Sequence, residues 1–372
     1  MTVPESFWDD IVLEEGQEKR LNLALVMNKD YNDPVWQNLI DQITWESMNR
    51  MLSGGYLTVQ GDTSNGVPGG KANDGTSGVR TNNPTTGDLM GFPTATVMAQ
   101  TWDVELINKL GDAFGHECLH AGIMELYAPC AGMHRTAYGG RNWEYYSEDP
   151  YISAKMLGAE SLGLQAKGVI VCAKHFAFND QEINRCGVAT WMNEQTAREI
   201  YLRAFEGGIV EAKILSLMAS FPRLGTKWVG SYRGLFTDIL RGEWGFQGFV
   251  ETDSAFNQDY MTKGTGRAEG IYAGVNFWMD GTAWEQWAAW KDNPTIVNAV
   301  REGVHGLLYA QAHSMAMNGI TTNSKIVYVT PWWIQTLDNV QLALGIVTGV
   351  MFAMAVASFV IHAVDKRKQQ TM

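Results

Sequence analysis

Charged side chains follow directly after short apolar runs at several places in this sequence. Lys174 and His175 come after the run Gly168–Ala173, and Asp253 comes after Gly248–Thr252. A lysine beside a histidine is unusual at the end of an apolar run, because both side chains are poorly placed in a protein core. A single aspartate in such a position is more often a turn residue than a functional one. If the runs are neighbouring parallel strands, these side chains form a polar site at one edge of the sheet.

A second pattern indicates different chemistry. His116 and His120 flank Glu117 in a literal H-E-x-x-H sequence, within a stretch that is predicted to be helical. Two histidines four residues apart on a helix can bind zinc, with the glutamate as a general base. The pattern is short, and no Gly-x-x-His extension follows it. A zinc peptidase is therefore a minor alternative.

The elements that would position these side chains alternate between strand-like and helix-like patterns. Apolar, β-branched runs occur at Met124–Ala128, Gly168–Ala173, Ile214–Ala219, Gly248–Thr252 and Gly274–Met279. Helix-like stretches occupy Val35–Met51, Trp102–Ala121, Tyr151–Leu164, Asn193–Lys213, Leu235–Arg241 and Ile296–Met317. Such alternation predicts parallel strands in an α/β fold. About 320 residues with several repeats favour a TIM-type (β/α)8 barrel, whose active site lies at the carboxyl ends of the strands.

Further candidate site residues follow two other runs, at the same expected edge of the barrel. Met218 and Ser220 come after Ile214–Leu217, and a long stretch with Arg141 and Glu144 comes after Met124–Ala128. The stretch Gly61–Thr94 is rich in Gly, Asn, Thr and Pro and is predicted to be loop.

The composition excludes some partners. The 372 residues include 40 acidic and 28 basic ones, for a formal charge of −12. Nucleic-acid binding needs a basic surface, so we expect no nucleic-acid partner. The cysteines have no Cys-x-x-Cys spacing, which argues against a redox motif or a zinc knuckle. We expect no metal and no cofactor.

The C-terminal part predicts a membrane anchor. Leu342–Val364 is a run of 23 residues with one histidine and no formal charge, preceded by Trp332 and Trp333 and followed by Lys366–Lys368. At about 1.5 Å per residue, the run can cross a hydrocarbon core about 30 Å thick. Basic residues favour the cytoplasmic side. We therefore expect a single-pass protein of the cell membrane, in contact with the lipid bilayer, with most of the chain outside the cell.

These patterns divide the chain into five parts. Residues 1–33 form an N-terminal extension or linker, 34–319 the barrel, 320–339 a stalk, 340–364 the transmembrane helix and 365–372 a basic cytoplasmic tail. The N-terminus has neither the basic nor the apolar region of a signal peptide. Because a large domain does not easily cross a membrane without one, we expect that Met1 is not the natural start.

Several long segments of the sequence match those of one enzyme family. They are GGRNWEYYSEDPYISAKMLGAESLGLQ (Gly139–Gln165), KGVIVCAKHFAFNDQEINR (Lys167–Arg185), REIYLRAFEGGIVEA (Arg198–Ala212) and LRGEWGFQGFVETD (Leu240–Asp253). The loops DGTSGVR (Asp74–Arg80) and FPTATVMAQTWD (Phe92–Asp103) also match. In this order the segments resemble glycoside hydrolase family 3, in its β-glucosidase and β-xylosidase branch. The resemblance extends from Pro34 to Gly319.

The resemblance implies a retaining β-glycosidase, which hydrolyses terminal β-linked glucosides or xylosides. The expected partner is therefore a β-linked oligosaccharide or glycoside. Asp253 matches the family's catalytic nucleophile, which forms a covalent glycosyl-enzyme. The other matching residues hold the sugar, and they are Asp74, Arg80, Arg141, Lys174, His175 and Met218.

Three residues depart from the family's pattern. Phe221 stands where a tyrosine is frequent, and Ser254 stands where a tryptophan commonly follows the nucleophile. Glu251 replaces a residue that is usually apolar. By strand alternation Glu251 points the same way as Asp253, and we expect it to be structural.

The acid/base is the largest departure. In this branch of the family it comes from a separate α/β sandwich domain, and in the one-domain branch from a Pro-Gly-His-Gly loop. Here the corresponding text is AFNDQEINR, which lacks that signature. Since some members carry the sandwich before the barrel, we expect an upstream domain to supply the acid. A non-catalytic, membrane-anchored, sugar-binding barrel is the main alternative, because fold alone does not determine function.

Overall fold

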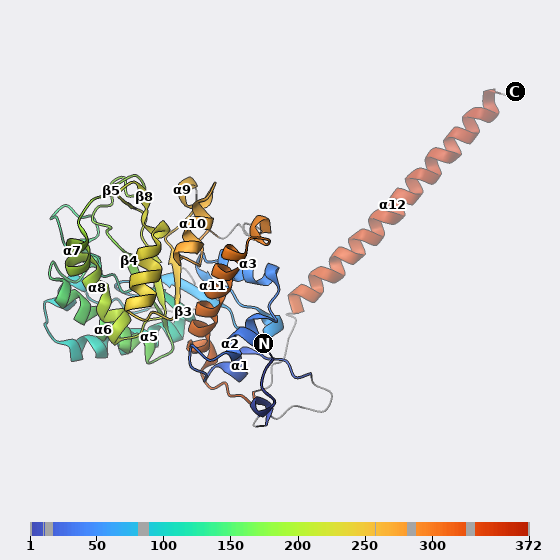
Figure 1. Ribbon diagram of the computed structural model, residues 1–372. Coiled ribbons are helices and arrows are strands. Elements are labelled where there is room, and N and C mark those ends of the chain that lie inside the picture. Colours follow the sequence, from blue (N-terminus) through green and yellow to red (C-terminus); the bar gives the residue numbers. More distant parts are fainter. Residues whose placement is uncertain are drawn as a thin grey trace. The chain divides into compact units, whose positions relative to one another are not determined.

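The computed structural model describes residues 2–9, 11, 18–80, 89–256, 258–280, 288–324 and 332–370. It forms two compact units, Met1–Ser324 and Lys325–Met372. The first unit is built on a curled sheet in the order β1–β2–β3–β4–β6–β9 (Figure 1). These strands are β1 (Thr58–Val59), β2 (Gly70–Asp74), β3 (Ile123–Tyr127), β4 (Ile170–Phe176), β6 (Ser216–Ala219) and β9 (Phe249–Thr252). Neighbours from β2 to β9 are parallel, whereas β1 is antiparallel to β2.

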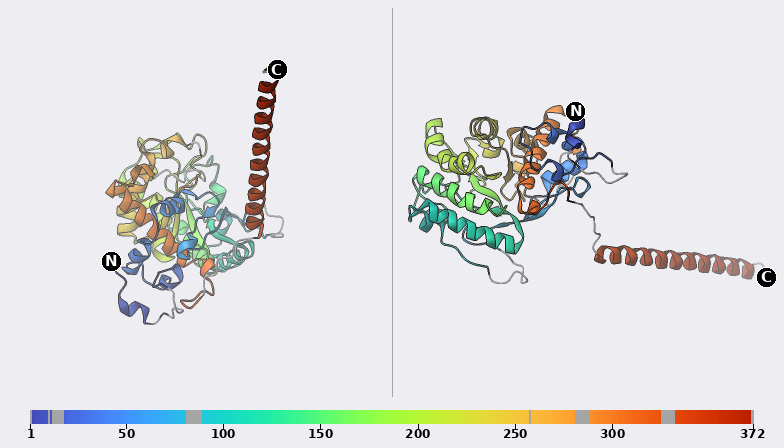
Figure 2. Two further views of the ribbon diagram at one scale, coloured as in Figure 1. Left: turned by 90° about the vertical axis from the view of Figure 1, so that its right-hand side faces the viewer. Right: turned by 90° about the horizontal axis from the view of Figure 1, so that it is seen from below.

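Helices follow or precede each parallel strand. They are α5 (Val104–Ala121), α6 (Pro150–Gln165), the continuous helical stretch 194–211, η8 (Gly234–Glu243), α10 (Gly266–Ala273) and α11 (Pro294–Ala312). Four of these helical stretches begin at a side chain that accepts from a free backbone N–H group of the first turn, as Asp103 does for α5 and Asn293 for α11. α5 and α6 lie side by side (Figure 2). Their backbones approach so closely that a Cβ on Gly111 would lie 2.3 Å from the Glu160 carbonyl oxygen.

Backbone hydrogen bonds connect the two edges of the sheet. The Thr252 N–H donates to the Phe277 carbonyl, and the Trp278 N–H donates to the Leu52 carbonyl at the end of α3 (Trp45–Ser53). On the other edge, the Ala72 N–H donates to the Leu57 carbonyl. The chain around Phe277 therefore closes the curl between β9 and the segment before β1.

The described residues do not form the eight regular repeats that the sequence predicts. Besides the five parallel strands there is a separate three-stranded sheet of β5 (Ala189–Thr190), β7 (Arg223–Leu224) and β8 (Lys227–Trp228). The predicted strand Gly274–Met279 makes only a single bridge, between Glu251 and Phe277. Its apolar residues are buried by the turn of chain that closes the curl, so burial and not a regular ladder explains the pattern.

Two other predicted elements are wrong in part. The stretch Val35–Met51 is two helices, α2 (Val35–Ile40) and α3, because the Thr44 side chain accepts from the Ser47 N–H and starts a new helix. The predicted loop Gly61–Thr94 contains β2. A Cβ on Gly70 would lie 2.7 Å from Met124, so this strand needs a residue that composition alone assigns to loop. The remainder of that stretch, residues 81–88, lies outside the described residues.

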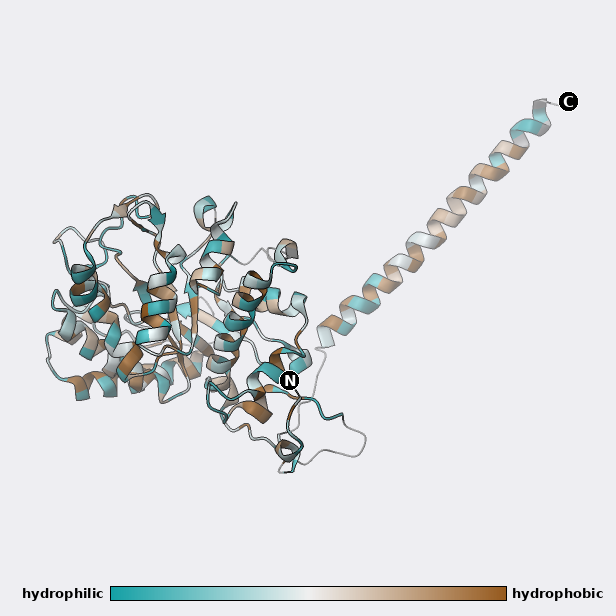
Figure 3. Cartoon of the chain, viewed as in Figure 1, coloured by the Kyte–Doolittle hydropathy of each residue, from teal (hydrophilic) through white to brown (hydrophobic). Residues whose placement is uncertain are grey.

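The second unit contains one long helix, α12 (Trp332–Gln370). Its segment Trp332–Val364 is long and apolar enough to cross a membrane. The most apolar stretch of 18 residues within it has a mean hydropathy of 2.3 and is not buried. Figure 3 shows hydrophobic residues along the middle of this helix and hydrophilic ones at its C-terminal end. The helix includes the whole predicted span 340–364, and it begins within the segment 320–339 that the sequence assigns to a stalk.

Candidate active site

The residues expected in the site lie together at the carboxyl ends of the parallel strands. Asp74 ends β2, Lys174 and His175 lie near the end of β4, and Asp253 directly follows β9. All seven expected residues line one cavity of about 380 Å³. The described residues of its wall are Tyr56, Leu57, Asn73, Asp74, Arg80, Tyr127, Arg141, Lys174, His175, Arg185, Met218, Asp253, Ser254 and Met279.

An ion pair between the ends of β2 and β4, on either side of β3, forms one wall of the cavity. The Lys174 Nζ donates to Asp74 Oδ1 at 2.8 Å. Burial acts to raise the pKa of Asp74, but the Lys174 ammonium outweighs it and holds that pKa below its ordinary value. Burial acts to lower the pKa of Lys174, but Cys130 and Asp74 outweigh it and raise that pKa. Both groups are therefore charged at neutral pH, which gives the cavity a fixed donor and a fixed acceptor.

Arg141 bridges two other groups of the site. It lies in the stretch after β3, and its Nε and Nη2 donate to Glu144 Oε2 at 3.1 and 2.5 Å. Its Nη1 lies 3.0 Å from His175 Nε2. Glu144 also accepts from the Cys130 thiol at 3.3 Å. The guanidinium is thus held at a defined angle, which a lysine could not reproduce.

His175 is a neutral imidazole in this environment. Burial, together with the charges of Arg141 and Lys174, holds its pKa well below its ordinary value. Because Nε2 accepts from Arg141, the ring proton is on Nδ1, which has no hydrogen-bond partner within the described part of the chain. Nε2 also lies 3.5 Å from Asp253 Oδ2, and with a neutral ring this contact is not an ion pair.

Asp253 is the carboxylate on which the surrounding side chains converge. Its Oδ1 accepts from the Ser254 backbone N–H at 2.7 Å, and its own N–H donates to the Ala219 carbonyl of β6. Burial raises the pKa of Asp253, while the positive charges of Arg185, Lys174 and Arg141 act against this rise. The arrangement presents a largely buried carboxylate next to cationic donors, which suits a nucleophile that must be ionised in a poorly solvated site.

Sequence reasoning did not identify several residues of the cavity. Arg185 lies within a quoted motif, pairs with Glu182 at 2.9 Å and stacks over the Phe221 ring at 4.6 Å. Tyr127 is the last residue of β3, where the alternation of the strand places it two residues after Glu125. Strand alternation could have identified Tyr127, but the contact of Arg185 with Phe221 depends on how two loops meet.

The three departures from the family pattern have separate environments. Phe221 is buried beneath the Arg185 guanidinium, and Ser254 lines the cavity. Glu251 is fully buried in β9 and does not line the cavity. Within the described residues it belongs to the one group that could hold a metal ion, together with Glu125 and Cys172.

The H-E-x-x-H sequence lies on the outer side of α5. His116 and His120 are exposed, and Glu117 accepts a hydrogen bond from the Met90 N–H at 3.2 Å. No residue of the motif lines the cavity. The two histidines of the H-E-x-x-H sequence therefore face solvent, outside the candidate active site, and the structure gives no support to a zinc peptidase.

Known proteins are similar to this chain in both sequence and fold. The family described as "Glycosyl hydrolase family 3 N terminal domain" matches residues 19–302. A β-glucosidase of Rhizobium radiobacter is 36% identical over 270 residues, which are 72% of this chain and 31% of that protein. The thermostable β-glucosidase B of Acetivibrio thermocellus is 37% identical over 188 residues, which are 50% of this chain and 24% of that protein. The chain thus spans about a third or less of the length of these relatives.

Solved structures agree with this assignment. β-Glucosidase 3B from Thermotoga neapolitana, in complex with α-D-glucose, matches with a TM-score of 0.67 and 29% identity, over 78% of this chain and 44% of that one. The β-glucosidase of Bifidobacterium adolescentis matches with a TM-score of 0.69 and 29% identity, over 78% of this chain and 42% of that one. The curled α/β sheet is therefore the TIM-like barrel of these enzymes. From the sequence match and the shared fold together, this chain belongs to glycosyl hydrolase family 3 and contains its N-terminal domain.

Proposed function

We propose that this chain carries the sugar-binding cavity and the nucleophile of a retaining β-glycosidase. The substrate is a terminal β-linked glucoside or xyloside, and Asp253 is the nucleophile. The single observation that supports this most directly is the position of Asp253 in a cavity with a neutral imidazole and three cationic side chains around it. The names of the relatives support the substrate class.

The reaction would proceed in two displacements. In the first, the Asp253 carboxylate attacks the anomeric carbon, a C–O bond to Asp253 forms, and the glycosidic C–O bond breaks. In the second, water attacks the same carbon and releases Asp253. The ion pair of Asp74 with Lys174 offers an acceptor and a donor to neighbouring sugar hydroxyls, and bidentate contacts of this kind keep the ring in one orientation.

The leaving oxygen needs a proton that the described wall of the cavity does not offer. Asp74 is engaged by Lys174, and Glu144, in the adjoining pocket, is engaged by Arg141 and Cys130. We therefore propose that the acid/base comes from a part of the protein outside this chain, an α/β sandwich domain. The length of the relatives leaves room for such a domain.

Covalent labelling tests the nucleophile. A 2-fluoro-glycoside with an activated leaving group should label the peptide that contains Asp253, because the fluorine slows the second step more than the activated first step. Asp253→Asn should lower turnover of an aryl glycoside about 10³-fold or more and abolish labelling. Asp259→Asn is the matched control, because Asp259 is exposed at the start of α9 (Asp259–Thr262) and pairs with Lys263.

Two results would contradict the proposal in different ways. A label on another residue, or normal turnover by Asp253→Asn, would refute the nucleophile assignment. Binding of the sugar by the full protein with its sandwich domain, without labelling or turnover, would instead favour the non-catalytic, sugar-binding barrel.

We also propose that α12 anchors the protein in the cell membrane, with the barrel outside the cell. The apolar segment Trp332–Val364 and the basic residues Lys366, Arg367 and Lys368 support this orientation. Protease added to intact cells should digest the barrel and leave intact a tag placed after Met372. Digestion of the tag with a protected barrel would reverse the orientation, and recovery of the chain without detergent would refute the anchor.

A further inference from the structure

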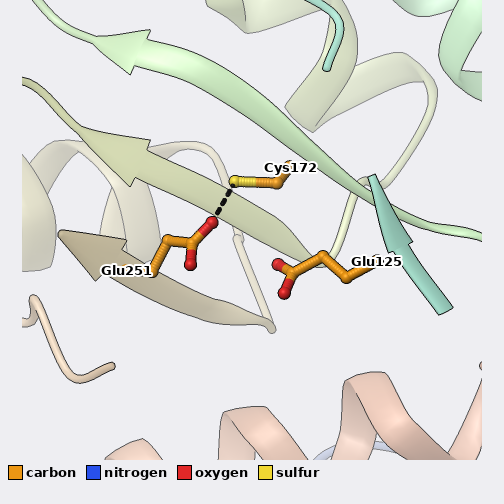
Figure 4. Close-up of side chains that lie close together, drawn as sticks. All are labelled: Glu125, Cys172 and Glu251. Atoms are coloured by element: carbon orange, nitrogen blue, oxygen red, sulfur yellow. Dashed lines mark hydrogen bonds between the residues drawn. The ribbon is translucent and has the colours of Figure 1, made fainter. Parts of the chain in front are cut away.

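A buried polar cluster lies directly beneath the candidate active-site cavity. Its members come from β3, β4 and β9, and each lies two residues before a residue of the cavity: Glu125 before Tyr127, Cys172 before Lys174, and Glu251 before Asp253. Side chains two residues apart in a strand point to the same side of the sheet. The cluster is therefore the next layer of the barrel interior. Figure 4 shows the Glu125 carboxyl and the Cys172–Glu251 pair facing one another.

The contacts within this cluster leave two polar atoms without a partner. The Cys172 thiol donates to Glu251 Oε1 at 2.8 Å, and the Ser216 hydroxyl donates to Glu125 Oε1 at 2.7 Å. None of these four residues has any exposed surface. The Oε2 atoms of Glu125 and Glu251 accept no hydrogen bond within the described residues. A buried oxygen without a partner is rare in folded proteins, and a bound ion or water is a frequent explanation.

Electrostatics make two bare carboxylates unstable here. Burial raises the pKa of Glu125, and burial followed by the charge of Glu125 raises that of Glu251. A divalent cation between the two carboxyl groups would give both unpartnered oxygens a partner and balance their charge.

We propose that this cluster is a binding site for a divalent transition metal ion, with Zn²⁺ as the best match. The ligands are the Cys172 thiolate and one carboxylate oxygen each of Glu125 and Glu251. Zinc binds sulfur at about 2.3 Å and carboxylate oxygen at about 2.0–2.2 Å, so tetrahedral ligands lie about 3.5 Å apart. In the structure one donor atom from each of the three side chains lies within 4.8 Å of the other two, and the Cys172 sulfur lies 2.8 Å from Glu251 Oε1. Small side-chain movements would complete the geometry, with the Ser216 hydroxyl or a water as fourth ligand.

The donor set also decides the kind of metal. Mg²⁺ and Ca²⁺ prefer oxygen ligands alone, whereas a thiolate selects softer ions such as Zn²⁺ and Co²⁺. Three anionic ligands and one divalent ion leave a single negative charge, and the Lys174 ammonium is close enough to lower the pKa of Glu251. The ion would join β3, β4 and β9 directly beneath Asp253, which is a structural role.

Cobalt provides the spectroscopic test. The full chain in detergent is stripped with a chelator and titrated with Co²⁺, and we expect one equivalent to bind with a thiolate-to-cobalt charge-transfer band. Elemental analysis after growth with zinc should give one Zn²⁺ per chain. Cys172→Ser should lose the band, and Glu251→Gln should weaken binding at least about 10-fold. Cys118→Ser is the matched control, because Cys118 is an equally buried thiol on α5 that lies outside the cluster.

The result is independent of glycosidase activity. A wild-type chain that binds no stoichiometric metal while folded would overturn the proposal and show that protons alone neutralise the cluster. A charge-transfer band that persists in Cys172→Ser would overturn it as well, since another thiol would then bind the ion. If Cys172→Ser does not fold, Glu251→Gln keeps the size of the side chain, and unchanged affinity in that variant also overturns the site.

Discussion

Asp74→Asn tests the ion pair that holds one wall of the cavity. The Lys174 side chain is 4% exposed and the Asp74 side chain is 46% exposed. Asparagine has the same shape but no charge, so the substitution leaves a buried ammonium without its counter-charge. Removing one partner of a fully buried pair costs about 3–5 kcal/mol, whereas an exposed pair contributes about 0–1 kcal/mol. Because water reaches Asp74, we expect the free energy of unfolding to fall by about 2–3 kcal/mol.

The size of this loss should depend on pH in a defined way. The pKa of Asp74 is below its ordinary 3.8 in the folded chain, so its contribution is present above that value and is lost as the pH falls through the folded pKa. The pKa of Lys174 is above its ordinary 10.5, so its contribution is present below that value and is lost as the pH rises through the folded pKa. The difference between wild type and variant should therefore be largest at neutral pH and shrink in strong acid or base.

Urea unfolding of the full chain in detergent measures both effects. Asp259→Asn is again the control, because its pair with Lys263 is 68% and 72% exposed and should contribute less than about 1 kcal/mol. If Asp74→Asn loses no more stability than Asp259→Asn at pH 7, the burial of Lys174 does not have the effect reasoned here. A loss that stays constant down to pH 2 would contradict the charge-based explanation.

Three further predictions concern the core and the chemistry. Burial raises the pKa of Glu160 to about 7, so the folded chain loses stability as the pH rises from 4.5 through 7. Glu160→Gln still accepts from the Tyr146 hydroxyl and should be more stable than wild type at pH 8 by up to about 3 kcal/mol. A difference in urea midpoint between the two proteins that does not widen from pH 5 to pH 8 would contradict this. Gly248→Ala should prevent folding, because the added Cβ would lie 1.9 Å from the Leu215 carbonyl oxygen. Gly234→Ala is the control and should fold, because its added Cβ would lie 4.0 Å from the nearest atom. Circular dichroism distinguishes the two variants, and a folded Gly248→Ala chain would be inconsistent with the close approach. Without a general acid, the chain should turn over nitrophenyl glycosides but cleave disaccharides about 10²–10⁴-fold more slowly than the complete enzyme. Azide, which needs no general base, should speed release of the sugar from Asp253. Disaccharide cleavage at a normal rate without azide would show that the chain carries its own acid.

Local patterns predicted most of the strands and helices but not their regularity. The runs before Lys174 and Asp253 are β4 and β9, because strands buried on both faces read as continuous apolar stretches. β2 was missed, since its residues Gly70–Asp74 have low β propensity and are held by strands on both sides. The run around Phe277 was predicted to be a strand, but its apolar residues serve to close the curl.

The sequence by itself determined which residue types stand at the strand ends and which family motifs surround them. Those signals are local, so Asp74, Lys174, His175 and Asp253 could be named without coordinates. Only the tertiary structure decided which side chains meet: Arg141 with His175, and the Cys172–Glu251 pair with Glu125. These contacts join strands and loops far apart in the chain, and they depend on strand order, register and the curl of the sheet. A shift of one residue in register would turn each of the strand side chains to the other face, which is why no local pattern could specify these contacts.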